Sequence, residues 1–135
     1  MSAQQITNYD RAPLVLGDVR SRTVTLRNVT AGEVTLSRGQ VLGRNSDGEY
    51  VVLQSTPVDG TQYPKAVLSA DTTIAASGTA TAQVFISGDF NAAGLVFDGA
   101  ETLETAIDGQ PIEDWMKAQS LFVQDVSELT DYDNQ

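Results

Sequence analysis

The sequence predicts a mainly β fold with a small C-terminal helical segment (α+β), built as a compact β core with a barrel-like sheet and an N-terminal arm. Short apolar runs rich in β-branched residues recur up to about residue 97 and are separated by frequent turn signals. This pattern is typical of a compact β core rather than a parallel α/β sheet. Helical spacing of apolar residues appears only beyond that point.

We expect one domain with a flexible segment at each end. Residues 1–13 are polar and lack periodicity, which predicts a mobile N-terminal arm. Residues 14–126 form the domain, with the β core to about residue 97 and a helical tail over residues 98–120. Residues 127–135 form an acidic C-terminal tail.

Two alternating runs in the first third predict a hairpin. Thr23–Arg27 and Val34–Leu36 both alternate polar and apolar residues, as a half-buried strand does. Ala31 and Gly32 lie between the two runs and offer a turn. We therefore expect these two runs to pair with each other.

A second hairpin is predicted around Asp47-Gly48. This dipeptide separates Val41-Leu42 from Tyr50–Leu53, and Asp-Gly between apolar runs suits a tight turn with positive φ at the glycine. Ala66–Leu68 is short and wholly apolar, which indicates a strand in the sheet interior. Ala82–Ile86 is predicted to be a central strand.

The tail is predicted to be helical because apolar residues take a new spacing there. Leu103, Ala106 and Ile107 lie at i, i+3 and i+4, and Gly109 is placed to end that helical turn. Pro111 suits the first position of a second helix.

The apolar face of this second helix consists of Ile112, Trp115 and Met116. Glu113 and Asp114 in the first turn favour the helix dipole. Leu121-Phe122-Val123 predicts a short final strand or a plug in the core.

The composition excludes most catalytic chemistries. The chain has no cysteine and no histidine, so disulfides, thiolate metal sites and the usual nucleophile–base pairs cannot form. No apolar run approaches the ~20 residues that span a bilayer. Glu101 and Glu104 could pair for acid–base work, and Asp131–Asn134 resembles the start of a calcium loop. We expect both groups to be solvated surface, and we expect no cofactor, no metal and no enzyme activity.

Charge is divided unevenly along the chain. The formal net charge is −10, yet the positive residues lie mostly in the first third. These are Arg11, Arg20, Arg22, Arg27, Arg38 and Arg44. The remainder is strongly acidic and would repel nucleic acid. Two explanations stay open: a solvated surface that only provides solubility, or an arginine-bearing region that faces an acidic partner while the acidic half faces solvent.

Five short motifs lie one after another between Gly39 and Phe97. They are G-Q-V-L-G at 39–43, D-G-E-Y at 47–50, A-V-L at 66–68, V-F-I-S-G-D-F-N at 84–91 and L-V-F at 95–97. In order and spacing they resemble the lambda-type head decoration proteins, the capsid cement family of tailed bacteriophages. The resemblance covers roughly the last two-thirds of the chain, helical tail included. Residues 1–37 depart from the family's minimal pattern.

The resemblance implies a structural protein of the virion. Such a protein would be made in the host cytoplasm, bind the major capsid protein as a homotrimer on the outer surface of the expanded capsid, and stabilise it against internal DNA pressure. It would contact neither nucleic acid nor membrane. On this interpretation the N-terminal side docks on the capsid, through Tyr9, Arg11, Arg20, Arg22 and Arg27. Trp115, Met116 and Phe122 would make the trimer contact.

Two other functions stay open on the sequence. The first is a receptor- or carbohydrate-binding β module on the phage head or a cell surface, which would need a cluster of exposed aromatic residues on one face. The second is a hydrolase that uses only carboxylates, which would need a deep acidic cleft.

Overall fold

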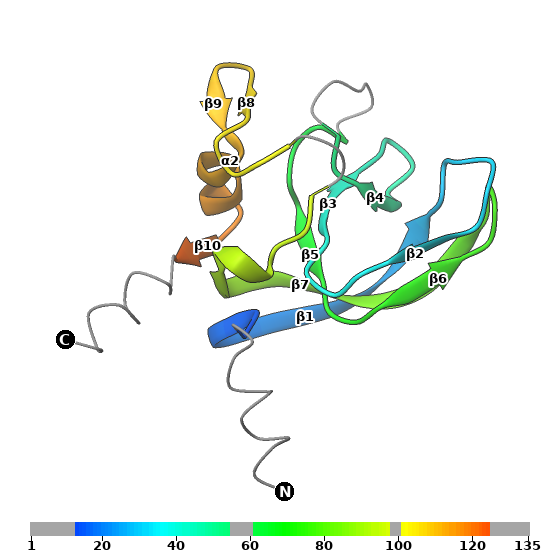
Figure 1. The fold of residues 1–135 in the computed structure, drawn as a ribbon, viewed down its shortest axis with the longest axis horizontal. Coiled ribbons are helices and arrows are strands. Elements are labelled where there is room, and N and C mark those ends of the chain that lie inside the picture. Colours follow the sequence, from blue (N-terminus) through cyan, green and yellow to red (C-terminus); the bar gives the residue numbers. More distant parts are fainter. Residues whose placement is uncertain (1–12, 55–60, 98–100, 125–135) are drawn as a thin grey trace, which may run out of the picture.

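The computed structural model describes residues 13–54, 61–97 and 101–124. Figure 1 shows how the elements are arranged. In chain order they are β1 (Val15–Arg27), β2 (Val34–Leu36), β3 (Val41–Arg44), β4 (Tyr50–Val52), β5 (Ala66–Leu68), β6 (Thr72–Ile74), β7 (Thr79–Asn91), the 3-10 turn η1 (Ala92–Gly94), β8 (Ala106–Ile107), β9 (Gln110–Pro111), α2 (Ile112–Ala118) and β10 (Leu121–Gln124).

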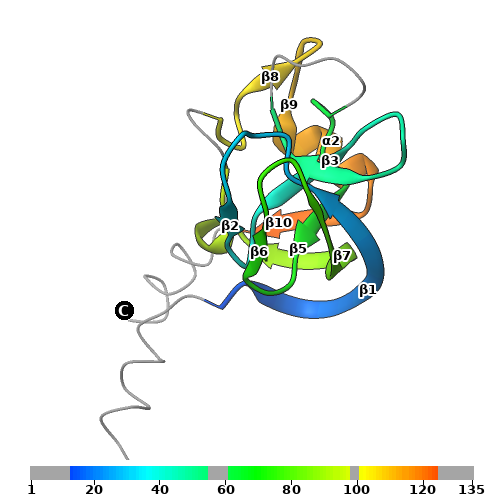
Figure 2. The same cartoon turned by 90° about the vertical axis from the view of Figure 1, so that its right-hand side faces the viewer.

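The main sheet has its strands in the order β1-β4-β3-β5-β7-β10, and β1 also pairs with β7. The first five strands in that order therefore form a closed ring of hydrogen-bonded neighbours. β10 joins β7 from outside the ring, parallel to it. β2–β6 and β8–β9 form two small separate sheets. The curvature of β1 around the ring is visible in Figure 2. The prediction of a mainly β fold with a C-terminal helix is confirmed.

β1 and β7 are the long strands of the ring. Each has 13 residues, and they run antiparallel from Val15 opposite Phe90 to Arg27 opposite Thr79. The predicted hairpin between Thr23–Arg27 and Val34–Leu36 is wrong, because β2 pairs with β6 instead. Alternation identifies a strand but carries no information about its partner.

The buried apolar side chains form two clusters. The helix-side core consists of Leu14, Val41, Leu53, Val67, Phe90, Ile107, Ile112, Met116 and Leu121. The hairpin-side core consists of Leu26, Leu36, Leu42, Tyr50, Ala66, Leu68, Ile74 and Val84.

Two short strands lie between these cores and supply both. On β3, Val41 belongs to the helix-side core and Leu42 to the hairpin-side core. On β5, Val67 and Leu68 divide in the same way. Side chains alternate across a strand, so a strand with a core on each face must be apolar throughout. This arrangement explains the continuous apolar runs and confirms Ala66–Leu68 as an interior strand.

An irregularity in β7 lets this strand also contribute to both cores. Val84 lies in the hairpin-side core and Phe90 in the helix-side core, although regular alternation would place them on the same face. The register shifts where Arg20 faces Ser87 and the next residue, Ser21, faces Phe85. The extra residue of this bulge, Ile86, changes the face that the rest of the strand presents.

The Asp-Gly turn forms as predicted. β3 and β4 are antiparallel with Arg44 opposite Tyr50, and Gly48 has φ of 84°. Asn45 closes the turn by accepting hydrogen bonds from the backbone N–H groups of Asp47 and Glu49.

The C-terminal region is less helical than predicted. Leu103–Ile107 is not a helix: Ala106 and Ile107 form β8, which pairs with β9 across a two-residue turn. Asp108 and Gly109 both have positive φ, of 52° and 83°. That conformation favours a tight hairpin, whereas a helix needs negative φ throughout. In the described part of the predicted tail, α2 is the helical segment, and Pro111 is its N-cap rather than its first residue.

The remainder of the tail agrees with the prediction. α2 buries Ile112 and Met116, and Leu121–Gln124 is a strand with Leu121 in the helix-side core. Residues 1–12, 125–135 and the calcium-loop resemblance at Asp131–Asn134 lie outside the described residues.

Candidate interaction surfaces

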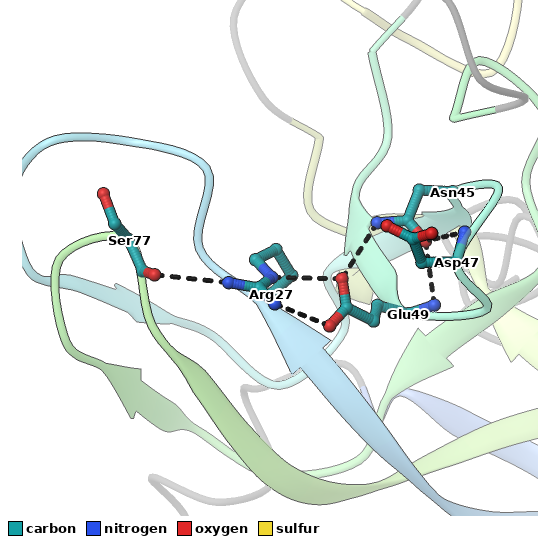
Figure 3. Close-up of polar contacts among 5 residues, drawn as sticks. All are labelled: Arg27, Asn45, Asp47, Glu49 and Ser77. Carbon is teal, nitrogen blue, oxygen red and sulfur yellow. Dashed lines mark hydrogen bonds and ion pairs between the residues drawn. The ribbon is translucent and has the colours of Figure 1, made fainter.

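The predicted docking arginines do not all have the same surroundings. Tyr9 and Arg11 lie outside the described residues. Arg27 is engaged within the protomer, where its guanidinium makes a two-bond ion pair with Glu49 (Figure 3). Nε donates to Oε1 at 3.0 Å and Nη2 to Oε2 at 2.8 Å. This fork geometry is the strong form of the arginine–carboxylate contact. Arg27 therefore has a structural role within the protomer.

The electrostatics of this pair follow from the contact. The hydrogen bonds from Arg27, aided by one from Asn45, lower the pKa of Glu49 below its ordinary value. The hydrogen bond to Glu49 and the charge of that carboxylate raise the pKa of Arg27. Nη1 of Arg27 also donates to the Ser77 carbonyl at 3.3 Å.

Arg38 and Arg44 are exposed but also make contacts within the protomer. Arg38 donates from Nη1 to the Ser69 carbonyl at 2.7 Å, and its guanidinium carbon lies 5.8 Å from the Phe85 ring centroid. Arg44 lies 5.7 Å from the Tyr50 ring centroid. Such cation–π contacts add modest stability at exposed sites.

Arg20 and Arg22 are the predicted docking residues that remain available. Both are exposed on β1, and neither guanidinium has a hydrogen bond or ion pair with any residue that the structure describes. They lie on the two sides of the register shift between Arg20 and Ser21. This part of β1 therefore presents two unpaired positive charges on a strongly acidic protein.

The three predicted trimer residues have different environments. Phe122 is 43% exposed on β10, which makes it the one exposed large aromatic residue in the described ranges. Trp115 is half-buried, and its indole N–H donates to the Ile107 carbonyl at 2.9 Å. Met116 is fully buried in the helix-side core. It has no surface for a partner, because the same face of α2 that carries Ile112 packs inward.

An aromatic contact that the sequence did not reveal lies beside Trp115. The Tyr63 and Trp115 ring centroids are 4.8 Å apart with the rings tilted by 59°. The Tyr63 hydroxyl donates a hydrogen bond to the Asp108 carboxylate, and this bond raises the pKa of Tyr63. Tyr63 and Asp108 are 45 residues apart in sequence, so no local pattern could have connected them.

A metal site and a membrane span each place particular requirements on the described residues. They contain no group of three histidine, cysteine, aspartate or glutamate side chains close enough to hold a metal ion. Within the same ranges, no helix combines the length and apolar character that crossing a bilayer requires. Glu101 and Glu104 follow the sheet in an irregular segment rather than on a helix.

The sequence model of the family described as bacteriophage lambda head decoration protein D matches residues 3–108. The match spans most of the chain and contains all five strands of the ring. The chain belongs to this family. It is therefore a structural protein of the phage head, and its family is not catalytic. No curated protein matches the chain.

The extent of the match differs at both ends from the expectation, which included the helical tail and left out the first third. Residues 1–37 were expected to depart from the family, yet the match begins at residue 3. It ends at residue 108, before α2 and β10. The residues beyond the match include Met116 and Leu121 of the helix-side core and the exposed Phe122.

Proposed function

We propose that this decoration protein binds the outer surface of the expanded phage capsid and stabilises the capsid against the pressure of packaged DNA. The observation that carries the proposal is the family match over residues 3–108. Burial of interface area between neighbouring capsid subunits, repeated around the shell, supplies the stabilisation. The partner is the major capsid protein, and no turnover is involved.

Docking uses the arm of residues 1–13 together with β1. The arm adds an extended segment to a free sheet edge of the capsid protein, where backbone hydrogen bonds supply affinity. Tyr9 and Arg11 belong to this arm. Arg20 and Arg22 support this assignment, because their charges are unpaired within the described residues and are free for carboxylates on the shell.

The protein acts as a homotrimer on the shell. A three-fold ring needs two different surfaces on each copy to meet head to tail. Phe122 supports one of these surfaces. Its aromatic side chain is exposed on the short outer strand β10, and contact with a second copy removes this apolar surface from water. The half-buried Trp115 extends this surface, and Met116 holds α2 in place beneath it.

The receptor- or carbohydrate-binding alternative lacks a comparable observation. Carbohydrate sites use exposed aromatic faces with free polar groups beside them. Tyr63 and Trp115 pack on each other, and the indole N–H and the phenol O–H both have partners within the protomer.

The test uses heads of the phage that encodes the protein, prepared without it in expanded and unexpanded forms. We expect the purified protein to sediment with expanded heads only, and imaging to place it in threes at three-fold positions. DNA-filled heads should then release their DNA at a higher temperature than undecorated heads. Isolated copies away from three-fold positions would end the trimer proposal, and absence of binding would end the capsid proposal.

A truncation tests the arm. Removing residues 1–13 should weaken binding to expanded heads and leave thermal unfolding unchanged, since these residues precede the first strand. Removing residues 125–135 is a control of similar length at the other end. Equal affinity for the two truncated proteins would show that the arm is not the docking element.

A further inference from the structure

Among the described residues, the contact between β1 and β4 has the fewest residue pairs of the strand contacts that close the ring. In the described residues, β1 and β4 share a single pair, Leu26 with Tyr50, and the two strands are parallel. β1 and β7 by contrast share ten pairs. The other short contacts of the ring are extended by backbone bonds at their ends, such as Lys65 N–H to the Leu42 carbonyl at 2.8 Å. Parallel pairing is also slightly less stable per residue than antiparallel pairing.

The Arg27–Glu49 ion pair lies directly beside this closure. Arg27 follows Leu26 on β1, and Glu49 precedes Tyr50 at the start of β4. The ion pair thus links the last residue of β1 to the residue before β4, immediately next to the one backbone pair of these strands. Glu49 has 18% of its side chain exposed and Arg27 has 37%, so water screens the contact only in part.

Neighbouring groups hold both partners in position. Asn45 donates to Glu49 Oε1 at 3.2 Å and accepts from the Glu49 backbone N–H at 2.9 Å, which fixes the carboxylate at the β3–β4 turn. The Ser77 carbonyl accepts from Arg27 at 3.3 Å and belongs to the turn before β7. One guanidinium therefore connects β1 with two separate turns, as Figure 3 shows.

We propose that the Arg27–Glu49 pair is an acid-sensitive latch that keeps the ring closed between β1 and β4. Protonation of Glu49 removes one partner's charge and opens this contact, while β1 and β7 remain paired. The other charged groups beside the latch include Asp47 in the same turn, whose charge acts on Arg27, and Arg44, which donates to the Gly48 carbonyl of that turn. The Ser77 turn contributes a neutral carbonyl. The proposal concerns the fold of the free protein and is independent of capsid binding.

The direction of the pH dependence follows from the pair. The folded-state pKa of Glu49 lies below its ordinary value. Its contribution is therefore fully present above the unfolded-state pKa of a glutamate and is lost as the pH falls through the lower folded-state pKa. Opening is expected in acid, below the range in which a free glutamate titrates.

The test is backbone hydrogen exchange at neutral pH, read as protection factors for the amides around Leu26 and Tyr50. In Glu49→Gln we expect protection there to fall roughly 3- to 10-fold, since a charge-assisted fork is lost from a partly exposed site. Arg27→Lys should give a fall in the same amides, because the lysine keeps the charge but cannot make two parallel bonds. Amides between β5 and β7, around Val84, should keep their protection in both variants.

Asp47→Asn is the matched control, because it removes a carboxylate from the same turn without touching the fork. It should leave the protection factors unchanged. The unsubstituted protein supplies a second measurement: the Leu26 and Tyr50 amides should lose protection in acid before the Val84 amides do. Equal protection in Glu49→Gln and the unsubstituted protein would overturn the latch. So would equal losses in Glu49→Gln and Asp47→Asn, which would indicate net charge rather than the pair.

Discussion

The two cores of this decoration protein are enclosed by different kinds of side-chain contact. Around the hairpin-side core, polar side chains cross-link the chain through the Arg27–Glu49 pair and the buried amide of Asn28. Around the helix-side core, the closure is mainly apolar and aromatic: α2 covers the cluster and Trp115 packs on Tyr63, with one hydrogen bond from each of these two side chains to the β8–β9 hairpin. The one exposed large aromatic residue of the described ranges, Phe122, also lies on this side.

The difference indicates which side is available for partners. A buried polar network must satisfy each donor and acceptor within the protomer, so it leaves few groups for another molecule. An apolar closure can continue across a subunit boundary without leaving unpaired polar groups. The surface around the helix-side core is therefore the better candidate for contact between copies. The following substitutions test this contrast between the two cores.

The largest effect is expected from Met116→Ala. Met116 is fully buried, and truncation removes packing and leaves a cavity, so the free energy of unfolding should fall by about 2–5 kcal/mol. Phe122→Ala removes more side-chain atoms from an exposed position and should change unfolding by only about 0.5 kcal/mol. Denaturant unfolding of the free protein measures both.

The same two variants separate the fold from assembly. Phe122→Ala should reduce occupancy of the three-fold positions on expanded heads, whereas Met116→Ala should do so only in proportion to its unfolding. Equal destabilisation by the two variants would mean that Phe122 is part of the core and not of an interface.

On the other side of the molecule, Asn28→Ala tests the polar closure. Asn28 is 3% exposed and donates to the carbonyls of Gly32, Ile74 and Ala75 while accepting from Thr30. Leaving these buried groups unpaired should cost about 2–3 kcal/mol of unfolding free energy.

Thr35→Ala is the control for this substitution. It breaks an exposed hydroxyl contact with Thr73 at 2.9 Å in the adjacent small sheet, and it should cost less than about 1 kcal/mol. Thermal or denaturant unfolding compares the two. An Asn28→Ala protein as stable as Thr35→Ala would show that water replaces the amide and that the polar closure contributes little.

A smaller effect concerns Tyr63 on the helix side. Its hydrogen bond to Asp108 raises its pKa above the ordinary value of 10.0. The stabilising contribution is therefore fully present below that value and is lost as the pH rises through the higher folded-state pKa. Absorbance titration of the folded protein should show that Tyr63 ionises at a higher pH than an ordinary tyrosine. The Tyr63→Phe variant identifies its signal.

Asp108→Asn should bring the ionisation of Tyr63 down toward the value of an ordinary tyrosine, because the acceptor charge is gone. Ionisation of Tyr63 at the same pH with and without the carboxylate would show that burial, and not the hydrogen bond, sets its pKa.

The smallest effect on stability is expected from reversal of Arg20 and Arg22 to glutamate. Both residues are exposed and unpaired within the described ranges, so unfolding should change by about 0.5 kcal/mol or less. Association with expanded heads should slow most at low salt, since rim charges act mainly on the association rate.

Reversal of Lys65 and Lys117 together is the matched control, because it changes the net charge by the same amount at other sites. Slower association in the arginine variant alone supports docking through β1. Insensitivity of both variants to salt would indicate an apolar contact with the capsid.

The sequence alone determined the elements whose cause is local. Asp47-Gly48 defined a hairpin because the glycine adopts positive φ where few other residues can. Ala66–Leu68 was recognisable as an interior strand from its continuous apolar composition, and the spacing of Ile112 and Met116 identified the buried face of α2. The motifs between Gly39 and Phe97 were sufficient to indicate the family.

Only the tertiary structure decided which segments meet. β2 pairs with β6, and Arg27 reaches Glu49, although the partners are far apart in the sequence and periodicity does not encode such contacts. The segment around Ala106 had helical spacing, yet the positive φ of Asp108 and Gly109 made it a hairpin. Tyr63, Asp108 and Trp115 come from three separate segments. Contacts between distant residues depend on how the whole chain packs, and a local sequence pattern carries no information about that packing.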